Sequence, residues 1–222
     1  MIVGEQKPIA EILSILEPYE KLLILGCGTC VKTCFAGGED EVAALASVLR
    51  LALGKDGRKK EIQEFTVERQ CEDEFIQEAA PHVKECQAVL SLACGAGVQG
   101  MVKRFAKVPV LPGVNTTFIG IQENQGLFTE ECQGCGNCGL ALFGGICPVT
   151  RCSKKLLNGP CGGSRNGVCE VDPDTECAWQ LIIERLTTLN QLDNLKLYIP
   201  PKNWQPSLSG GPRKLKREDH II

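Results

Sequence analysis

The chain has 222 residues, of which 43% are hydrophobic and only 5% are aromatic, and its formal net charge is −3. This length and composition allow one large hydrophobic core or two small ones. The slight negative charge and the scarcity of aromatic side chains disfavour the basic, aromatic-rich surface that nucleic-acid binding requires. We therefore expect no nucleic-acid partner.

The chain contains 14 cysteines and only two histidines. A chain of this length can fold by burying apolar side chains, so it does not need disulfides for stability. Glu5, Pro8 and Glu11 interrupt any apolar run near the start, so we expect no secretory signal, no membrane span and a cytoplasmic location. In a reducing compartment, closely spaced cysteines indicate metal ligands or redox groups, and here almost every metal ligand has to be a thiolate.

The first part of the chain alternates apolar runs with helical patterns, which is typical of a parallel-sheet protein. After a short amphipathic helix over residues 9–16, the pattern predicts strands at residues 21–26, 61–67, 88–93 and 108–114. Helices are expected between them, over residues 39–54, 72–86 and 98–106. Right-handed crossovers then give an α/β domain over residues 1–128, a small open parallel sheet of the Rossmann or flavodoxin-like kind with helices on both faces.

The character of the sequence changes at about residue 129. Residues 129–177 hold eight cysteines and many glycines without sustained periodicity, so we expect a loop-rich module that folds around metal and has no ordinary core. A helix is predicted over residues 177–192. Within residues 178–222, the remainder after this helix is rich in proline and glycine and ends in basic residues, which predicts an extended tail that packs on this chain or contacts a partner.

Three loops that follow predicted strands carry cysteines. Ligands of open parallel sheets gather beyond the carboxyl ends of the strands, so these thiols are expected at one edge. They are Cys27, Cys30, Cys34, Cys71 and Cys94. Four thiolates are what an iron–sulfur cluster or a structural zinc ion requires. The alternatives are buried free thiols, which suits Cys86, and a redox-active pair of Cys27 and Cys30.

The motif GAGVQG follows the third predicted strand, and Gly95, Gly97 and Gly100 fit the dinucleotide-binding pattern. However, the following strand does not end in an acidic residue that could hold a ribose. The competing interpretation is that the glycines allow the backbone to approach a cluster closely and the helix to pack against the strand.

A second constellation lies in the cysteine-rich module, where C-x2-C-x2-C spacing is similar to that of bacterial ferredoxin loops. The candidate ligands are Cys132, Cys135, Cys138, Cys147, Cys152, Cys161, Cys169 and Cys177. These eight cysteines could form two four-thiolate sites, and all-thiolate ligation does not separate zinc from iron–sulfur. Basic side chains lie among these cysteines, namely Arg151, Lys154, Lys155 and Arg165. They either balance the charge of a cluster, contact an anionic partner or are solvated.

Several longer motifs resemble one family. They are GCGTC, CFAGGE, ERQCE, LSLACGAGVQ, NTTFIG, GGICPVTRC, LLNGPCGGS and CEVDPDTECAWQL. Over residues 5–213 the chain resembles the small iron–sulfur subunit of methylenetetrahydrofolate reductase in acetogenic bacteria, also called the reductase carboxy-terminal-domain family. The resemblance implies two or more 4Fe-4S clusters, a flavin-containing catalytic subunit as the partner, and a place in the one-carbon metabolism of the Wood–Ljungdahl pathway.

Two functions follow as hypotheses. In the first, the chain is a non-catalytic electron-transfer subunit that exchanges electrons with the flavin of the catalytic subunit and with a redox donor protein. In the second, it is an assembly module in which zinc holds a rigid surface and no electrons move. A mixed case places a cluster in the sheet domain and zinc in the cysteine-rich module. No GxSxG or HExxH motif indicates an active site of the chain's own.

Overall fold

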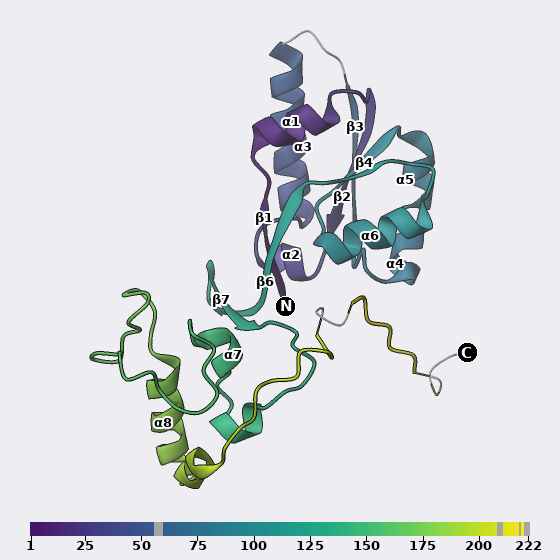
Figure 1. Cartoon of the computed structure of the whole chain (residues 1–222). Coiled ribbons are helices and arrows are strands. Elements are labelled where there is room, and N and C mark those ends of the chain that lie inside the picture. The colour runs from purple at the N-terminus through teal and green to yellow at the C-terminus, as the bar shows by residue number, and fades with distance from the viewer. Residues whose placement is uncertain (56–59, 208–210, 218, 220–222) are drawn as a thin grey trace. The chain divides into compact units, whose positions relative to one another are not determined.

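The computed structural model describes residues 1–55, 60–207, 211–217 and 219, and in residues 54 and 55 it describes the backbone alone. The chain divides into two compact units, Met1–Thr129 and Glu130–Ile222, which we call unit 1 and unit 2 (Figure 1). The helix and tail that follow residue 177 lie within unit 2.

Unit 1 is built on a parallel sheet, as the sequence predicts. Its strands are β2 (Lys21–Cys27), β3 (Glu61–Val67), β4 (Ala88–Ser91) and β5 (Val110–Pro112). The order is β3-β2-β4-β5, and all neighbouring strands are parallel. Strand β5 is shorter than expected. Pro109 and Pro112 have no N–H group to donate to a neighbouring strand, which restricts regular pairing to three residues.

Helices precede and connect these strands where the sequence predicts them, except that the short helix over residues 30–33 was not predicted and that the helices after β3 and β4 differ from their expected bounds. They are α1 (Ile9–Leu16), α2 (Cys30–Thr33), α3 (Glu39–Lys55), α4 (Asp73–Glu78), α5 (Ala80–Glu85) and α6 (Gly95–Arg104). The single helix expected over residues 72–86 is two helices, because Pro81 in the first turn of α5 cannot donate the hydrogen bond that continues α4. Helix α6 begins three residues earlier than expected, directly after Cys94.

The parallel sheet separates two apolar cores. Leu22 and Ile24 of β2 belong to one core, which α1 and α3 cover, whereas Leu23 and Leu25 belong to the other, which contains residues of α4, α5 and α6. This alternation is the period of two of a β-strand, applied to a sheet that is buried on both faces. Each fully buried leucine or isoleucine contributes about 1.5–3 kcal/mol to folding. The expectation of a sheet covered on both faces is confirmed.

A second sheet in unit 1 was not predicted from the sequence. It consists of β1 (Ile2–Gln6), β6 (Val114–Asn124) and β7 (Leu127–Cys132), in the order β1-β6-β7. Strand β1 pairs antiparallel with β6, so that Ile2 lies opposite Ile119. Strand β1 leaves no local signal because its partner is more than 100 residues away. Strands β6 and β7, which only Gln125 and Gly126 separate, are neighbours in the chain and were missed although their signal is local.

Unit 2 has few regular elements, and a small apolar core holds it together. The elements are η1 (Leu140–Phe143), α7 (Pro148–Arg151), α8 (Ala178–Thr188) and η2 (Leu192–Lys196). Phe143 packs edge-on against Trp179, with 5.8 Å between ring centroids. Cys177, Ile182 and Leu186 complete this core. The expectation that the cysteine-rich stretch has no ordinary core is therefore wrong, because Phe143 and Cys177 of that stretch pack against α8.

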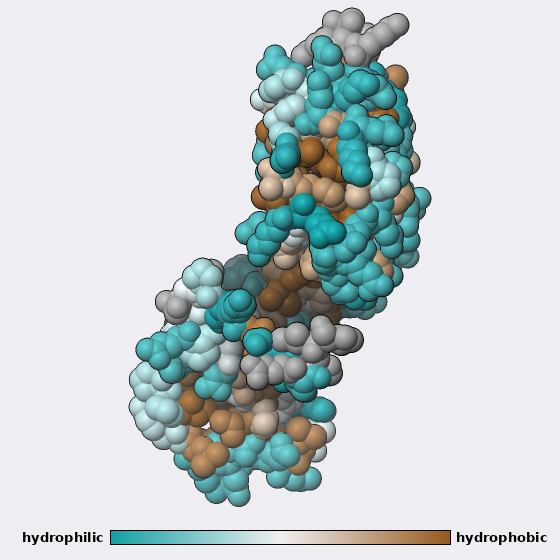
Figure 2. Space-filling view, turned by 90° about the vertical axis from the view of Figure 1, so that its right-hand side faces the viewer, coloured by the Kyte–Doolittle hydropathy of each residue, from teal (hydrophilic) through white to brown (hydrophobic). Residues whose placement is uncertain are grey.

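Helix α8 is shorter than the predicted segment 177–192. Asn190 has a φ of 55°, a left-handed conformation that ends a helix. The amide of the next residue, Gln191, donates to the Leu186 carbonyl at 2.8 Å, which closes the last turn. Beyond it, exposed apolar side chains follow in η2 and after it, among them Leu195, Leu197 and Tyr198. Figure 2 shows such hydrophobic residues among hydrophilic ones on the surface of both units.

The tail lies against the cysteine loop of its own unit. We call residues 199–207 and 211–213 the strap. Asn158 holds its beginning through two hydrogen bonds with the backbone of Ile199, at 2.8 and 2.7 Å. Farther along, Lys202 donates to the Asn137 carbonyl at 2.7 Å and Arg213 donates to the Gly134 carbonyl at 3.3 Å. No described helix of either unit is long and apolar enough to cross a membrane.

Candidate functional site

The first candidate site lies at the carboxyl edge of the parallel sheet. After β2 the chain adds β3 on one side, and it later adds β4 on the other, so β2 and β4 flank a topological switch point. Ligands of open α/β sheets bind outside the strand ends at such points. Cys27 is the last residue of β2. Cys94 follows the end of β4 by three residues and directly precedes α6. Cys71 follows β3, so three strand ends bring a thiol to this edge.

The Cys71 thiol lies close enough to Cys27 and Cys94 for their charges to influence its ionisation. Burial raises the pKa of the Cys71 thiol, and the negative charges of Cys27 and Cys94 raise that pKa further. Cys27 is buried and Cys94 is partly buried, whereas Cys71 is exposed. The structure therefore brings Cys27, Cys71 and Cys94 together, at the edge where the sequence places them.

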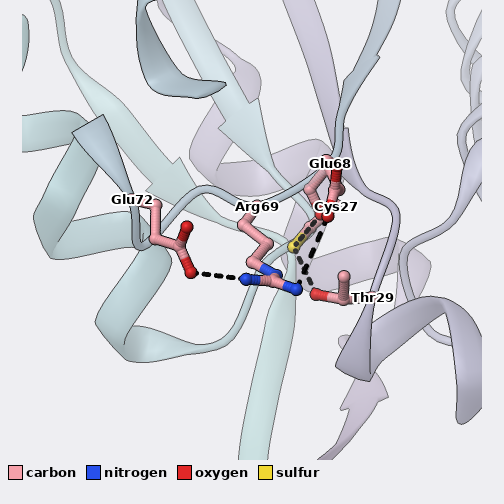
Figure 3. A network of polar contacts seen from close by, with 5 residues as sticks. All are labelled: Cys27, Thr29, Glu68, Arg69 and Glu72. Atoms are coloured by element: carbon pink, nitrogen blue, oxygen red, sulfur yellow. Dashed lines mark hydrogen bonds and ion pairs between the residues drawn. The ribbon is translucent and has the colours of Figure 1, made fainter. Parts of the chain in front are cut away.

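A cation lies beside this group of thiols. Figure 3 shows the Arg69 guanidinium between the Glu72 carboxylate and the loop that carries Cys27. Arg69 pairs with Glu72 at 2.6 Å and with Glu68 at 3.5 Å. The hydrogen bond and the charge of Glu72 raise the pKa of Arg69. The Cys27 Sγ atom lies 3.8 Å from both the Glu68 carbonyl and the Thr29 hydroxyl. Two carboxylates therefore already balance the charge of Arg69, and the charge of Glu72 further raises the pKa of the neighbouring Cys71.

The other two cysteines of the amino-terminal constellation are placed differently. Cys30 is the first residue of α2 and is partly buried. Cys34 is buried, and its Sγ atom lies 3.4 Å from both the amide and the carbonyl of Gly4. Burial raises the pKa of the Cys34 thiol, and the charge of Cys30 adds to that increase. Cys34 therefore contacts β1 in the core, whereas Cys30 begins a helix in the loop after Cys27.

The glycines of GAGVQG serve the packing of α6 against the segment before Cys71. A Cβ atom on Gly100 would lie 2.6 Å from the Gln70 carbonyl oxygen, and one on Gly97 would lie 3.0 Å from the Gln70 Cβ atom. At Gly95 a Cβ atom would meet only the Thr116 hydroxyl, at 3.7 Å. The close approach of α6 to the loop before Cys71 therefore explains why positions 97 and 100 are glycine. This agrees with the interpretation that the glycines of this motif allow the helix to pack closely.

In unit 2, the C-x2-C-x2-C loop begins where β7 ends. Cys132 is the last residue of β7 and accepts a hydrogen bond from the Gly134 amide at 3.3 Å. Gly134 and Gly136 have φ angles of 60° and 78°, which suit glycine and allow the tight turns between the cysteines. Cys147 directly precedes α7.

The strap affects one thiol of this loop. Burial raises the pKa of Cys135, but hydrogen bonding to the Asn137 backbone and to Lys202 outweighs burial, so the net pKa lies below its ordinary value. The ammonium group of Lys202 also favours the thiolate by its charge. Lys202, a residue of the tail, thus favours the thiolate form of Cys135, which is the form that binds metal.

The remaining four cysteines line one cavity. Its volume is about 20 Å³ and its wall includes the side chains of Cys152, Cys161, Cys169 and Cys177. The hydrogen bond from Ser153 is the main cause that lowers the pKa of Cys169. The sequence suggested two four-thiolate sites in this module without saying which cysteines belong together. The cavity groups the last four.

Two of the basic side chains near this cavity pair with acids of the same unit. Arg151 bonds Glu131 at 2.8 Å, and Lys154 pairs with Glu170. Lys155 donates to the Gln133 side chain at 3.2 Å. Arg151 and Lys154 are therefore already paired with carboxylates of the same unit.

The chemistry of the donor sets fits a thiolate-bound metal group. Every candidate ligand is a cysteine, a donor that both iron–sulfur clusters and structural zinc accept. Within the described part of the chain, no three His, Cys, Asp or Glu side chains stand as a group that could hold a metal ion. The candidate thiols therefore share the sheet edge and the cavity of unit 2 without forming a set of metal ligands in this arrangement.

Comparison with known families bears on the carboxy-terminal part. Residues 111–205 match the family model described as "Methylene-tetrahydrofolate reductase C terminal". No curated protein and no solved structure matches the chain. The match includes all eight cysteines of unit 2 and ends within the strap. The match covers less than half of the chain. It supports a relation of this segment to methylenetetrahydrofolate reductases, whereas the iron–sulfur subunit is a proposal, and the cysteines from Cys27 to Cys94 lie outside the matched residues.

Proposed function

We propose that the chain is an iron–sulfur electron-transfer subunit of a methylenetetrahydrofolate reductase, and that it exchanges electrons with the flavin of a catalytic subunit. The observation that carries the proposal is the convergence of Cys27, Cys71 and Cys94 at the switch point of the sheet. The match of residues 111–205 to a reductase family supports the choice of enzyme. An iron–sulfur cluster supplies one-electron redox chemistry when it is bound.

The ligands in unit 1 follow from the placement of its thiols. Cys27, Cys71 and Cys94 supply three of four thiolates. Cys30 is better suited than Cys34 for the fourth, because Cys34 is buried and already hydrogen-bonded to Gly4. Arg69 adds no net positive charge to this site, because Glu68 and Glu72 pair with it. In unit 2 the C-x2-C-x2-C loop and Cys147 form the second set of candidate cluster ligands.

A structural zinc site is a second candidate for part of unit 2. The cavity lined by Cys152, Cys161, Cys169 and Cys177 measures about 20 Å³. One water-sized sphere needs about 10–15 Å³ on this measure, so the space suits a single ion better than an eight-atom cluster. Four thiolates are the ligands of a closed structural zinc site. This mixed arrangement keeps electron transfer in unit 1 and gives the cavity a role in holding unit 2 together.

The first experiment is anaerobic purification of the full chain, alone and with a flavin-containing reductase subunit. Iron, zinc and acid-labile sulfide are measured, and visible spectra are recorded before and after addition of dithionite. We expect iron with matching sulfide and an absorption band that dithionite bleaches. Zinc alone, without sulfide and without bleaching, would sink the electron-transfer proposal and leave the assembly module.

Two cysteine variants locate the site in unit 1. Cys71→Ser should lose iron and sulfide, because it removes a proposed ligand. Cys86→Ser is the matched control, since Cys86 follows α5 at the start of β4, at the opposite edge of the sheet, and donates to the Val83 carbonyl at 3.4 Å. Equal iron contents in the two variants would remove Cys71 from the ligand set.

A further inference from the structure

One buried polar side chain connects the three segments that carry the thiols of unit 1. Gln70 is 0% exposed. Its Nε2 atom donates to the Leu25 carbonyl at 2.8 Å and to the Gly26 carbonyl at 3.0 Å. Its Oε1 atom accepts a hydrogen bond from the Ser91 hydroxyl at 2.6 Å. The Gln70 side-chain amide thus connects the loop after β3 with the carboxyl ends of β2 and β4.

Each of these contacts lies just before a cysteine. Gly26 precedes Cys27, and Gln70 itself precedes Cys71. Ser91 ends β4, and its hydroxyl oxygen accepts a hydrogen bond from the Ala93 amide at 3.3 Å, next to Cys94. The side chain of one residue therefore joins the backbone positions from which all three converging thiols project.

We propose that Gln70 is a positioning residue, whose buried amide fixes the segments before Cys27, Cys71 and Cys94 so that their thiols meet at one place. The inference deepens the proposed function and rests on it for the identity of the group bound, because a metal centre needs ligands that surrounding hydrogen bonds hold in place. The convergence of the thiols itself does not depend on which metal group binds.

Glutamine is the side chain that these partners require. Two carbonyl oxygens need donors and one hydroxyl needs an acceptor, and a side-chain amide offers both. In Gln70→Glu, a carboxylate oxygen faces the Leu25 and Gly26 carbonyls and repels them. In Gln70→Leu, those carbonyls lose their amide donor in a buried place, which is costly. The loop cannot easily shift to compensate, because Gly97 and Gly100 of α6 pack against Gln70.

Arsenite tests this inference without an iron–sulfur cluster, because As(III) binds several thiolates at once and requires them to lie together. The reduced, metal-free full chain is titrated with sodium arsenite and alkylated with N-ethylmaleimide, and protection of each cysteine is measured by peptide mass spectrometry. In the wild type we expect Cys27, Cys71 and Cys94 to become protected together. In Gln70→Leu, which removes three hydrogen bonds, their joint protection should need at least about tenfold more arsenite, because leaving even one buried polar group without its partner costs enough for a factor of about ten.

Two controls separate positioning from general damage. Gln77→Leu changes an exposed glutamine of α4, whose side chain bonds Asp73, and should leave protection unchanged. In every variant, protection of the four cavity cysteines of unit 2 serves as an internal reference. Circular dichroism checks that each variant is folded.

A folded Gln70→Leu chain in which arsenite protects the three thiols at the wild-type concentration overturns the inference. If Gln70→Leu does not fold, Ser91→Ala decides by the same measurement: a shift smaller than tenfold but measurable supports the role, and no shift refutes it. Wild-type protein that shows joint arsenite protection but binds no iron or sulfide would refute the electron-transfer proposal and leave the role of Gln70 standing.

Discussion

Replacing Gly100 by alanine tests whether the glycines of α6 are present for packing. The new methyl group would lie 2.6 Å from the Gln70 carbonyl oxygen and 3.2 Å from the Ile76 Cδ1 atom. The carbonyl belongs to the backbone and cannot rotate away as the end of a side chain can. Overpacking of this kind costs about 1–3 kcal/mol. Alanine regains about 1 kcal/mol of helix propensity. We therefore expect Gly100→Ala to lower the free energy of unfolding by about 1 kcal/mol.

The matched control is Gly95→Ala in the same helix. Its methyl group would meet only the Thr116 hydroxyl at 3.7 Å, an ordinary van der Waals contact. This variant should be as stable as the wild type or slightly more stable, because it gains propensity without a clash. Urea unfolding followed by far-ultraviolet circular dichroism measures both. Thermal unfolding should show a decrease of about 4 °C for Gly100→Ala alone.

A second readout connects this packing to the candidate site. Moving the Gln70 carbonyl also moves Cys71, whose Cα atom would lie 3.7 Å from the new methyl group. Cys71 should therefore be alkylated faster in Gly100→Ala than in Gly95→Ala. If Gly100→Ala is as stable as Gly95→Ala, and Cys71 is alkylated at the wild-type rate in both variants, then α6 does not need glycine where it packs against the loop.

Three further predictions concern unit 2. Lys202→Met should raise the pKa of Cys135, because the ammonium group favours the thiolate; iodoacetamide should then react more slowly near neutral pH, and the midpoint of the rate against pH should move upward. Asn158→Leu removes both hydrogen bonds to Ile199, so amide exchange at Ile199 and proteolysis of the strap should become faster, while unchanged exchange argues against this anchor. Trp179→Ala should destabilise unit 2 by about 3–5 kcal/mol in chemical unfolding, because the indole is buried; a loss below about 1 kcal/mol contradicts the proposed core.

The proposed electron-transfer role and the zinc alternative differ in which cysteines hold a redox-active group. The sheet edge offers three thiols from different strands, held in place by Gln70 and accompanied by Arg69. The cavity of unit 2 offers four thiols beside a packed tryptophan. The first arrangement suits an electron carrier that a partner has to approach, and the second suits an ion that stabilises a small core.

Elements with a local signal could be predicted from the amino-acid sequence alone. The apolar periodicity of residues 39–54 predicts α3, and Val42, Leu45 and Leu49 are buried as expected. The four strands of the parallel sheet were also predicted, β3 from its alternation of polar and apolar residues and the others from short apolar runs. From the order of strands and loops, the meeting of Cys27, Cys71 and Cys94 could be expected as well.

Features that depend on partners far apart in the chain could be seen only in the folded structure. Strand β1 exists because β6, more than 100 residues away in the chain, pairs with it. Cys34 contacts Gly4 of that strand, and this contact could not be predicted while β1 was unknown. The grouping of four cysteines around one cavity and the role of Gln70 likewise depend on contacts between separate segments. Residue type and spacing predict which chemistry a chain can perform, but the packing of remote segments selects the side chains that meet.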